Sequence, residues 1–220
     1  MSEEQGENTR MNVAKDESPE VENKELNETE KDVAIMQSDD KHLLENKWTF
    51  WYYEPKGKIS AENLHKVTSF DTVEDFWCLF NHIKKPSQLS LQSHYSYFKY
   101  GIKPNWDDDK NSAGGRWILE IPLSNKIHLI DEYWMKILLS MIGEVYDSSE
   151  INGAIISIQS KITKLSVWTN NASKDNKNNI LAIGSKIKEV LDTRDIKMVY
   201  ESFKRTENKQ NSFIKRMYSL

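Results

Sequence analysis

The sequence NKWTFWYY at residues 46–53 decides the fold, because its aromatic residues recur on both faces of a strand. One face holds Trp48, Phe50 and Tyr52, and the other holds Thr49, Trp51 and Tyr53. Aromatic residues favour strands, and their presence on both faces indicates a strand that is at least partly covered on each side. We therefore predict a strand over residues 46–54, followed by a loop over 55–64 that contains proline and glycine.

A second stretch, FDTVEDFW at residues 70–77, joins a short strand over 65–70 to a helix. Asp71 and Glu74 have the capping-box spacing that begins a helix. The stripe predicted to face the core consists of Phe76, Leu79, Phe80 and Ile83. Val73 and Trp77 extend the apolar surface to one flank, where they either close the core or anchor a partner helix, with Leu139 of the next helix as a neighbour.

The remaining pattern alternates strands with single helices. Two further helices are predicted at 131–144 and 178–191, and further strands at 95–100, 116–122, 153–159, 162–169 and 196–203. Strands that follow one another directly, with single helices between some of them, favour an α+β fold in which helices cover one face of an antiparallel sheet.

Charge divides the 220 residues into two parts. Residues 1–40 hold 13 acidic against 4 basic side chains and no aromatic residue, a net charge of −9. Such a segment cannot bury enough apolar surface to offset the entropy of ordering it. We therefore expect a disordered acidic tail over 1–40 and a single domain over 41–220, whose net charge is +5.

Cysteine content and hydropathy point to the environment of the protein. Cys78 is the single cysteine, which excludes an internal disulfide and a cysteine-based zinc site. No apolar run approaches the roughly 18 residues of a membrane span, and the N-terminus has no apolar signal region. We expect a soluble, intracellular protein.

A tryptophan and a carboxylate stand side by side in the polar segment PNWDDD at residues 104–109. The indole face of Trp106 attracts a cationic planar group, and the carboxylate of Asp107 can accept two parallel N–H donors from a guanine edge. The alternative is that Trp106 packs back onto the domain. The sequence alone leaves both open.

Lys164 and Trp168 are four apart in a predicted strand, and therefore lie on one face, roughly 13 Å apart. Arg116 and Lys161 could join the same rim. A basic rim that ends in an aromatic ring suits a phosphate chain attached to a stacked base. Simple solvation of lysines on a half-exposed strand is the competing interpretation.

Signals for catalysis are poor. The five histidines show no metal-ligand spacing, there is no nucleophile elbow, and Gly114-Gly115 belongs to neither a P-loop nor a dinucleotide fingerprint. The three consecutive carboxylates of residues 107–109 have no paired base or nucleophile. The sequence therefore indicates no enzyme, no catalytic residue, no metal site and no cofactor.

Taken together, the blocks resemble the eukaryotic translation initiation factor 4E family over about residues 42–205. The matching segments, in order, are NKWTFWY at 46–52, FDTVEDFW at 70–77, YSYFK at 95–99, PNWDDD at 104–109, GGRW at 114–117, IGE at 142–144 and VWT at 167–169.

The resemblance implies a curved antiparallel sheet with three main helices on its convex face and a slot for the mRNA cap on its concave face. In that slot Trp106 stacks on 7-methylguanine, Asp107 binds the guanine edge and Trp168 touches the added methyl group. The phosphate path implied by the resemblance is lined by Arg116, Lys161 and Lys164.

The resemblance also implies a partner surface on the convex side. It consists of His42, Val73, Trp77 and Leu139, and docks the helical motif of a 4G-type scaffold or of 4E-binding regulators. It further implies a cytoplasmic monomer, also found in the nucleus, that acts in translation initiation and its regulation, with no membrane partner.

Four positions depart from the family pattern. Ser60 or, with a shifted gap, Ala61 stands where the family supplies a second stacking tryptophan. Gln159 stands where the family places a phosphate-binding arginine, Asp107 where it uses glutamate, and Lys136 where an acidic residue is common. These departures predict weaker or altered cap binding and an altered choice of partner, unless Tyr52, Tyr53 or a moved loop compensates for the missing ring. They keep open an alternative, a regulatory relative that acts mainly through protein–protein interaction.

Overall fold

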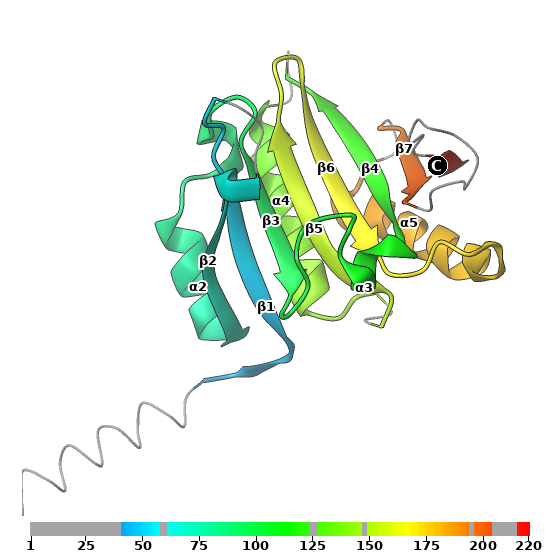
Figure 1. The fold of residues 1–220 in the computed structure, drawn as a ribbon, viewed down its shortest axis with the longest axis horizontal. Helices are drawn as coiled ribbons and strands as arrows, with labels where there is room; N and C mark the ends of the chain where they lie inside the picture. Colours follow the sequence, from blue (N-terminus) through cyan, green and yellow to red (C-terminus); the bar gives the residue numbers. More distant parts are fainter. Residues whose placement is uncertain (1–40, 58–60, 124–126, 147–148, 194–195, 204–214) are drawn as a thin grey trace, which may run out of the picture. The chain divides into compact units, whose positions relative to one another are not determined.

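A computed structural model describes residues 41–57, 61–123, 127–146, 149–193, 196–203 and 215–220 (Figure 1). The predicted tail over 1–40 lies outside the described residues. The second compact unit of the chain, His42–Leu220, carries all the elements that follow.

Eight described strands form one curved antiparallel sheet in the order β2-β1-β3-β5-β6-β4-β7-β8. In chain order they are β1 (Leu43–Tyr53), β2 (Leu64–Thr72), β3 (His94–Lys99), β4 (Gly115–Pro122), β5 (Ile151–Ile158), β6 (Ile162–Thr169), β7 (Met198–Ser202) and β8 (Lys215–Ser219). The predicted α+β class with an antiparallel sheet is confirmed.

The longer helices lie on one side of this sheet. They are α2 (Val73–His82), α4 (Ile127–Ile142) and α5 (Lys177–Leu191); α4 and α5 run behind the sheet in Figure 1, and α2 lies beside β2. The shorter elements are α3 (Asp109–Ser112), η1 (Ala61–Asn63), η2 (Pro86–Gln88) and η3 (Lys174–Asn176). Phe76 of α2, Trp134 of α4 and Ile183 of α5 belong to one core with the sheet residues beneath them.

Strand register sorts the sheet into two faces. The core face contains a row across six strands made of Phe50, Tyr97, Ala154, Val167, Trp117 and Tyr200. In each strand, a residue adjacent to the core residue points to the opposite face, which is concave and which we call the open face. The corresponding row there is Thr49, Phe98, Gly153, Trp168, Arg116 and Glu201.

The predicted alternation in β1 is confirmed. Trp48 and Phe50 are buried in the core, where Trp48 stacks on Tyr97 with ring centroids 5.2 Å apart. Tyr52 packs on the same side, with its ring 5.6 Å from that of Tyr95. Tyr53, on the open face, stacks on His94 with ring centroids 4.5 Å apart and planes 4° apart.

The predicted start of the first helix is wrong by one residue. Thr72, not Asp71, is the N-cap of α2, because β2 continues through Thr72 in extended geometry. The Thr72 hydroxyl accepts a hydrogen bond from the Asp75 amide at 3.2 Å and donates one to the Asp75 carboxylate at 2.7 Å. Asp71 instead pairs with Lys47 across the strands at 3.1 Å.

The pair Gly114-Gly115 has a packing role. A Cβ on Gly114 would lie 1.9 Å from the Thr169 carbonyl oxygen, and one on Gly115 would lie 2.4 Å from the Glu201 carbonyl oxygen. Side chains there would therefore push β4 away from β6 and β7. Because this register sets the open face, the two glycines help to define the candidate site.

Burial of His94 makes stability depend on pH. Desolvation lowers its pKa from 6.5 to about 4, so the folded chain holds a neutral imidazole that gains a proton on unfolding. Between these two pKa values the unfolded state binds more protons than the folded state. The stability that the neutral His94 contributes is therefore fully present above about pH 6.5 and is lost as the pH drops towards 4. We predict that this group removes about 2 kcal/mol of unfolding free energy between roughly pH 7 and 5.

Urea unfolding at both pH values tests this prediction. His94→Gln should lose that part of the pH dependence, and His65→Gln, at an exposed position of β2, should keep it. Equal pH dependence in the wild type and both variants would contradict the role of His94.

Candidate functional site

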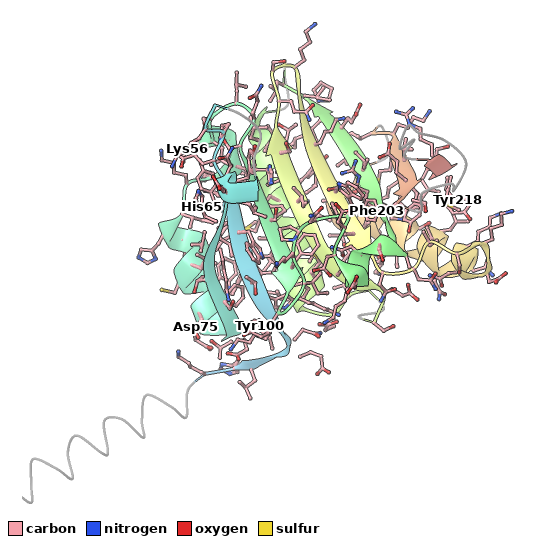
Figure 2. All side chains as sticks on the ribbon, in the orientation of Figure 1. Lys56, His65, Asp75, Tyr100, Phe203 and Tyr218 are labelled. Atoms are coloured by element: carbon pink, nitrogen blue, oxygen red, sulfur yellow. The ribbon has the colours of Figure 1, made fainter. Side chains whose placement is uncertain are left out.

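Trp168 lies at the centre of the open face. It is 3% exposed, and its ring packs against Phe98 with centroids 5.4 Å apart and against Phe203 with centroids 4.5 Å apart. Its indole Nε1 donates a hydrogen bond to Ser166 Oγ at 3.2 Å. Phe203, labelled in Figure 2, directly follows β7.

Arg116 extends over this aromatic cluster. Its guanidinium carbon lies 5.8 Å from the Trp168 ring centroid and 5.9 Å from that of Phe203. Arg116 Nη2 donates to Glu201 Oε2 at 3.2 Å, and the two side chains are 28% and 13% exposed. Arg116 Nε is buried with no hydrogen-bond partner among the described residues, so the guanidinium retains unused donor capacity.

Trp106 and Asp107 lie together in the connection between β3 and β4. The Trp106 side chain is 41% exposed, and Asp107 is exposed as well. The Asp107 amide donates to Asn105 Oδ1 at 3.2 Å, and Asp108 caps α3 by accepting the Lys110 amide at 3.0 Å. The connection is thus a built turn that leaves an indole and a carboxylate accessible.

Two buried amides hold this turn in place. Asn111, which is fully buried, donates from Nδ2 to the carbonyls of Lys103 at 2.9 Å and Asn105 at 2.8 Å. Asn152 donates from Nδ2 to Asn111 Oδ1 at 2.9 Å and to the Lys110 carbonyl at 2.8 Å. The segment carrying Trp106 is therefore tied to β5, because Asn152 belongs to that strand.

The predicted phosphate ligands are distributed along the open face. Lys164 lies on this face of β6, across from Glu120 of β4, and its Nζ is 3.3 Å from Glu120 Oε1. Lys161 is exposed in the turn between β5 and β6. The structure thus brings Arg116 onto Trp168, places Lys164 farther along the same face, and puts Lys161 at the end of the strand pair.

The surroundings of the missing second tryptophan are only partly described. Ser60 lies outside the described residues. Next to that gap a cavity of about 450 Å³ is lined by Tyr53, Asn63, Gln159 and neighbouring residues. Tyr52 belongs to the core and one ring face of Tyr53 is covered by His94, so Tyr52 does not replace the missing ring and Tyr53 has at most one face to offer.

The predicted partner residues lie on and around α2 and α4. Trp77 is 36% exposed and makes edge-on contacts with Phe76, at 5.1 Å, and Phe80, at 5.9 Å, while Val73 and Leu139 are partly buried. His42 Nδ1 lies 2.7 Å from Glu74 Oε1. This hydrogen bond is the main reason that the pKa of Glu74 is lowered.

Lys136, the unusual residue of this region, forms an ion pair with Glu132 one turn earlier in α4, at 2.7 Å. Its charge is therefore shared within the helix. A half-exposed pair of this kind contributes little to stability, so a partner could recruit either charge.

Several residues that shape the site escaped the sequence analysis: Phe98, Asn111, Asn152, Glu201 and Phe203. Asn111 and Asn152 are 41 positions apart, and Arg116 and Glu201 are 85 apart. Only strand order brings such pairs together. A local signal existed in one case, because Asn111 belongs to the segment NSAGG at residues 111–115, and asparagine, serine and glycine are typical turn residues.

A search of the described residues for metal-binding clusters and membrane-spanning helices found neither. No three His, Cys, Asp or Glu side chains in it gather closely enough to hold a metal ion. No helix among the described residues is long and apolar enough to span a membrane.

These features define an α+β protein with an accessible indole in the connection between β3 and β4 and a buried indole next to cations on its open sheet face. The sequence profile of eukaryotic initiation factor 4E matches residues 43–218. Eukaryotic translation initiation factor 4E1 of Drosophila melanogaster is 45% identical over 183 residues, which cover 82% of this chain and 70% of that relative. The chain belongs to the eukaryotic initiation factor 4E family.

Solved structures agree with this assignment. Ascaris suum eIF4E-3, in complex with an m2,2,7G cap, superposes with a TM-score of 0.74 at 36% identity and covers 82% of this chain and 98% of its own. C. elegans eIF4E-3, in complex with the 4E-binding protein Mextli, superposes with a TM-score of 0.70 at 37% identity and covers 74% of this chain and 94% of its own.

The buried amide network yields a prediction about stability. Asn111→Ala should lower the free energy of unfolding by about 1–3 kcal/mol, because it leaves two part-buried carbonyls without their donor and the buried Asn152 amide without an acceptor. It should also speed amide hydrogen exchange around Trp106.

Ser112→Ala is the matched control, since Ser112 is exposed and its hydroxyl makes a single bond to the Asp109 carbonyl. Urea unfolding and exchange mass spectrometry provide the readouts. Equal effects of the two substitutions would show that Asn111 does not anchor the turn.

Proposed function

We propose that this chain binds the 7-methylguanosine cap of mRNA on its open face and recruits a 4G-type scaffold through α2 and α4 during translation initiation. The observation that carries the proposal is the accessible pair Trp106-Asp107, held by buried amides beside a face that carries Arg116 over Trp168. Similarity to eIF4E-3 of Ascaris suum, whose structure is a cap complex, supports it.

The chemistry of recognition is cation–π binding combined with an acidic clamp. Methylation gives the guanine ring a positive charge, and the exposed indole of Trp106 supplies a face that attracts it. The Asp107 carboxylate accepts two N–H donors from the guanine edge, although its shorter side chain requires the base to come closer than a glutamate would. Unmethylated guanine offers the same edge without the charge.

The triphosphate is assigned to Arg116, Lys164 and Lys161. The unused Nε donor of Arg116 suits a phosphate oxygen, although binding must compete with Glu201 for the same guanidinium. Lys164 likewise must share its charge with Glu120. Contact between Trp168 and the methyl group requires a shift of Arg116 and Phe203, because these side chains cover the Trp168 ring.

The partner surface is assigned to His42, Val73, Trp77 and Leu139. A half-exposed indole beside partly buried aliphatic side chains suits the apolar face of an amphipathic helix. The ion pair Lys136–Glu132 at the neighbouring turn of α4 offers both charges to a partner. Similarity to C. elegans eIF4E-3, solved with the binding protein Mextli, supports a partner of the 4E-binding class.

The other parts of the proposal follow from the same assignment. The chain acts by binding, without catalysis and without a cofactor, as a cytoplasmic monomer that also enters the nucleus, with residues 1–40 as a tail outside the domain. A regulatory role that dispenses with the cap is not favoured, because similar chains are solved as cap complexes.

Fluorescence titration tests the cap site. The wild-type protein should show stronger quenching by 7-methylguanosine triphosphate than by GTP. Trp106→Ala should lower the affinity for the methylated nucleotide by about 5- to 150-fold, equivalent to roughly 1–3 kcal/mol of stacking. Trp77→Ala is the matched control, because it also removes a half-exposed indole. Equal affinity for the two nucleotides, or an unchanged affinity in Trp106→Ala, would contradict the assignment.

The reciprocal experiment tests the partner surface. An amphipathic helical peptide from a 4G-type scaffold should bind the wild type and Trp106→Ala equally in fluorescence anisotropy. Trp77→Ala should lower the affinity for that peptide by about 30-fold or more, as expected for a central aromatic anchor. If both variants bind the peptide like wild type, the helical partner docks elsewhere.

A further inference from the structure

The outer side of α4 carries two opposite charges among apolar residues. Glu132, Met135, Lys136 and Leu139 are partly exposed, whereas the residues between them are buried in the core. Their spacing of three and four places them on one face of the helix. Gly143, which is exposed, directly follows the helix on the same face. We call these five residues the α4 stripe.

The α4 stripe is connected to the α2 part of the proposed partner surface through the start of β1. Asn46 Nδ2 donates a hydrogen bond to Glu144 Oε1 at 2.8 Å, directly after Gly143. Four residues earlier in the same strand segment, the His42 carbonyl accepts the Val73 amide at 2.9 Å. The Gly143 end of the stripe therefore lies toward the start of α2. From there the stripe extends over roughly 16 Å of helix, about three turns.

Position decides which of the two charges a docked helix meets first. Lys136 lies one turn before Leu139, whereas Glu132 lies two turns before it. The Lys136 side chain is also the less exposed of the two, at 32% against 44%. A helix that packs on Leu139 therefore removes water from Lys136 before it reaches Glu132. A cation that loses water in this way requires negative charge close by.

The carboxylates at the start of α2 are already engaged within the chain. Glu74 accepts hydrogen bonds from the His42 amide, at 2.9 Å, and pairs with the His42 ring at 2.7 Å. Asp75 accepts a hydrogen bond from the Thr72 hydroxyl at 2.7 Å. An acidic residue of a partner would be repelled by these carboxylates if it lay over α2. It is favoured over α4, next to Lys136.

We propose that Lys136 selects partner helices that carry an acidic residue against the α4 stripe. The inference rests on the proposed partner surface and deepens it by naming the charge that the partner presents. An ammonium has three N–H donors, so Lys136 can bind the incoming carboxylate while it retains Glu132. A lysine or arginine of the partner at the same place meets Lys136 first and is rejected.

A helix with an uncharged residue at this place is the competing occupant. It would leave the Lys136–Glu132 ion pair closed and would meet no net charge. However, it would cover both ions without giving either a new partner, and the desolvation of an ion pair is costly. An acidic residue offsets part of that cost, because it supplies a second carboxylate to the ammonium.

A charge scan of the partner peptide, read by fluorescence anisotropy, tests the inference. The parent is an amphipathic helical peptide from a 4G-type scaffold, and each of its polar positions is replaced in turn by glutamate, glutamine or lysine. The wild type is compared with the exchanged variant Glu132→Lys/Lys136→Glu. This variant keeps the net charge and an ion pair at the same i, i+4 spacing, so α4 remains stable. Equal urea midpoints of the two proteins verify this.

The matched control exchanges another pair within a helix. Lys186 and Glu189 of α5 are paired at 3.0 Å, and Lys186→Glu/Glu189→Lys exchanges their charges without changing the net charge. The α5 pair lies outside the proposed partner surface. This control should therefore bind every peptide of the scan as the wild type does.

At one position of the peptide, or at two positions one turn apart, the wild type should bind the glutamate form about tenfold more tightly than the lysine form, the sum of two partly exposed charge effects. The glutamine form should fall between them. The exchanged variant should prefer lysine at that position by a similar factor. Salt should reduce both preferences, because the charges are partly exposed.

Three results would overturn the inference: equal affinities at every position in the wild type, a preference of the wild type for lysine, or a preference for glutamate that the exchanged variant retains. Trp77→Ala, measured with the parent peptide, separates this failure from that of the partner surface. A parent peptide that does not bind, or that binds Trp77→Ala as it binds the wild type, contradicts the partner surface and the inference with it. Binding that depends on Trp77 but ignores peptide charge contradicts the inference alone.

Discussion

The register between β4 and its neighbours is the constraint on which the rest of the structure depends. It sets Arg116 opposite Trp168 on one side and opposite Glu201 on the other. A slip of one residue would exchange the two faces, sending Arg116 into the core and Trp117 out of it. Gly114 and Gly115 protect this register, because a Cβ at either position would lie within 2.5 Å of a backbone oxygen of β6 or β7.

The same register separates the two proposed binding surfaces. Every second residue of the strands packs beneath α2, α4 and α5, and Trp77 is exposed on this side of the sheet. The intervening residues form the open face. A substitution on one surface therefore leaves the other largely undisturbed. On the open face, ion pairs with Glu120 and Glu201 hold the cations Lys164 and Arg116 in place, so an incoming phosphate displaces carboxylates rather than water alone.

Period-two and helical patterns predicted much of this arrangement. The strand over 162–169 has the predicted bounds, and the shared face of Lys164 and Trp168 follows from their spacing. What escaped prediction depends on long-range pairing: β8, the ion pair of Glu201 and the link between Asn111 and Asn152. The cap of α2 was misplaced because Asp71 and Thr72 are both good caps, and only the length of β2 decides between them.

A crystal structure of the chain with 7-methylguanosine triphosphate tests the central claim most directly. The account predicts the base against the Trp106 indole, its N–H edge on the Asp107 carboxylate, and phosphate oxygens within hydrogen-bond distance of Arg116 and Lys164. It also predicts that Arg116 turns away from Glu201. A nucleotide bound away from Trp106, or one whose phosphates leave the Arg116–Glu201 pair intact and uncontacted, would contradict it.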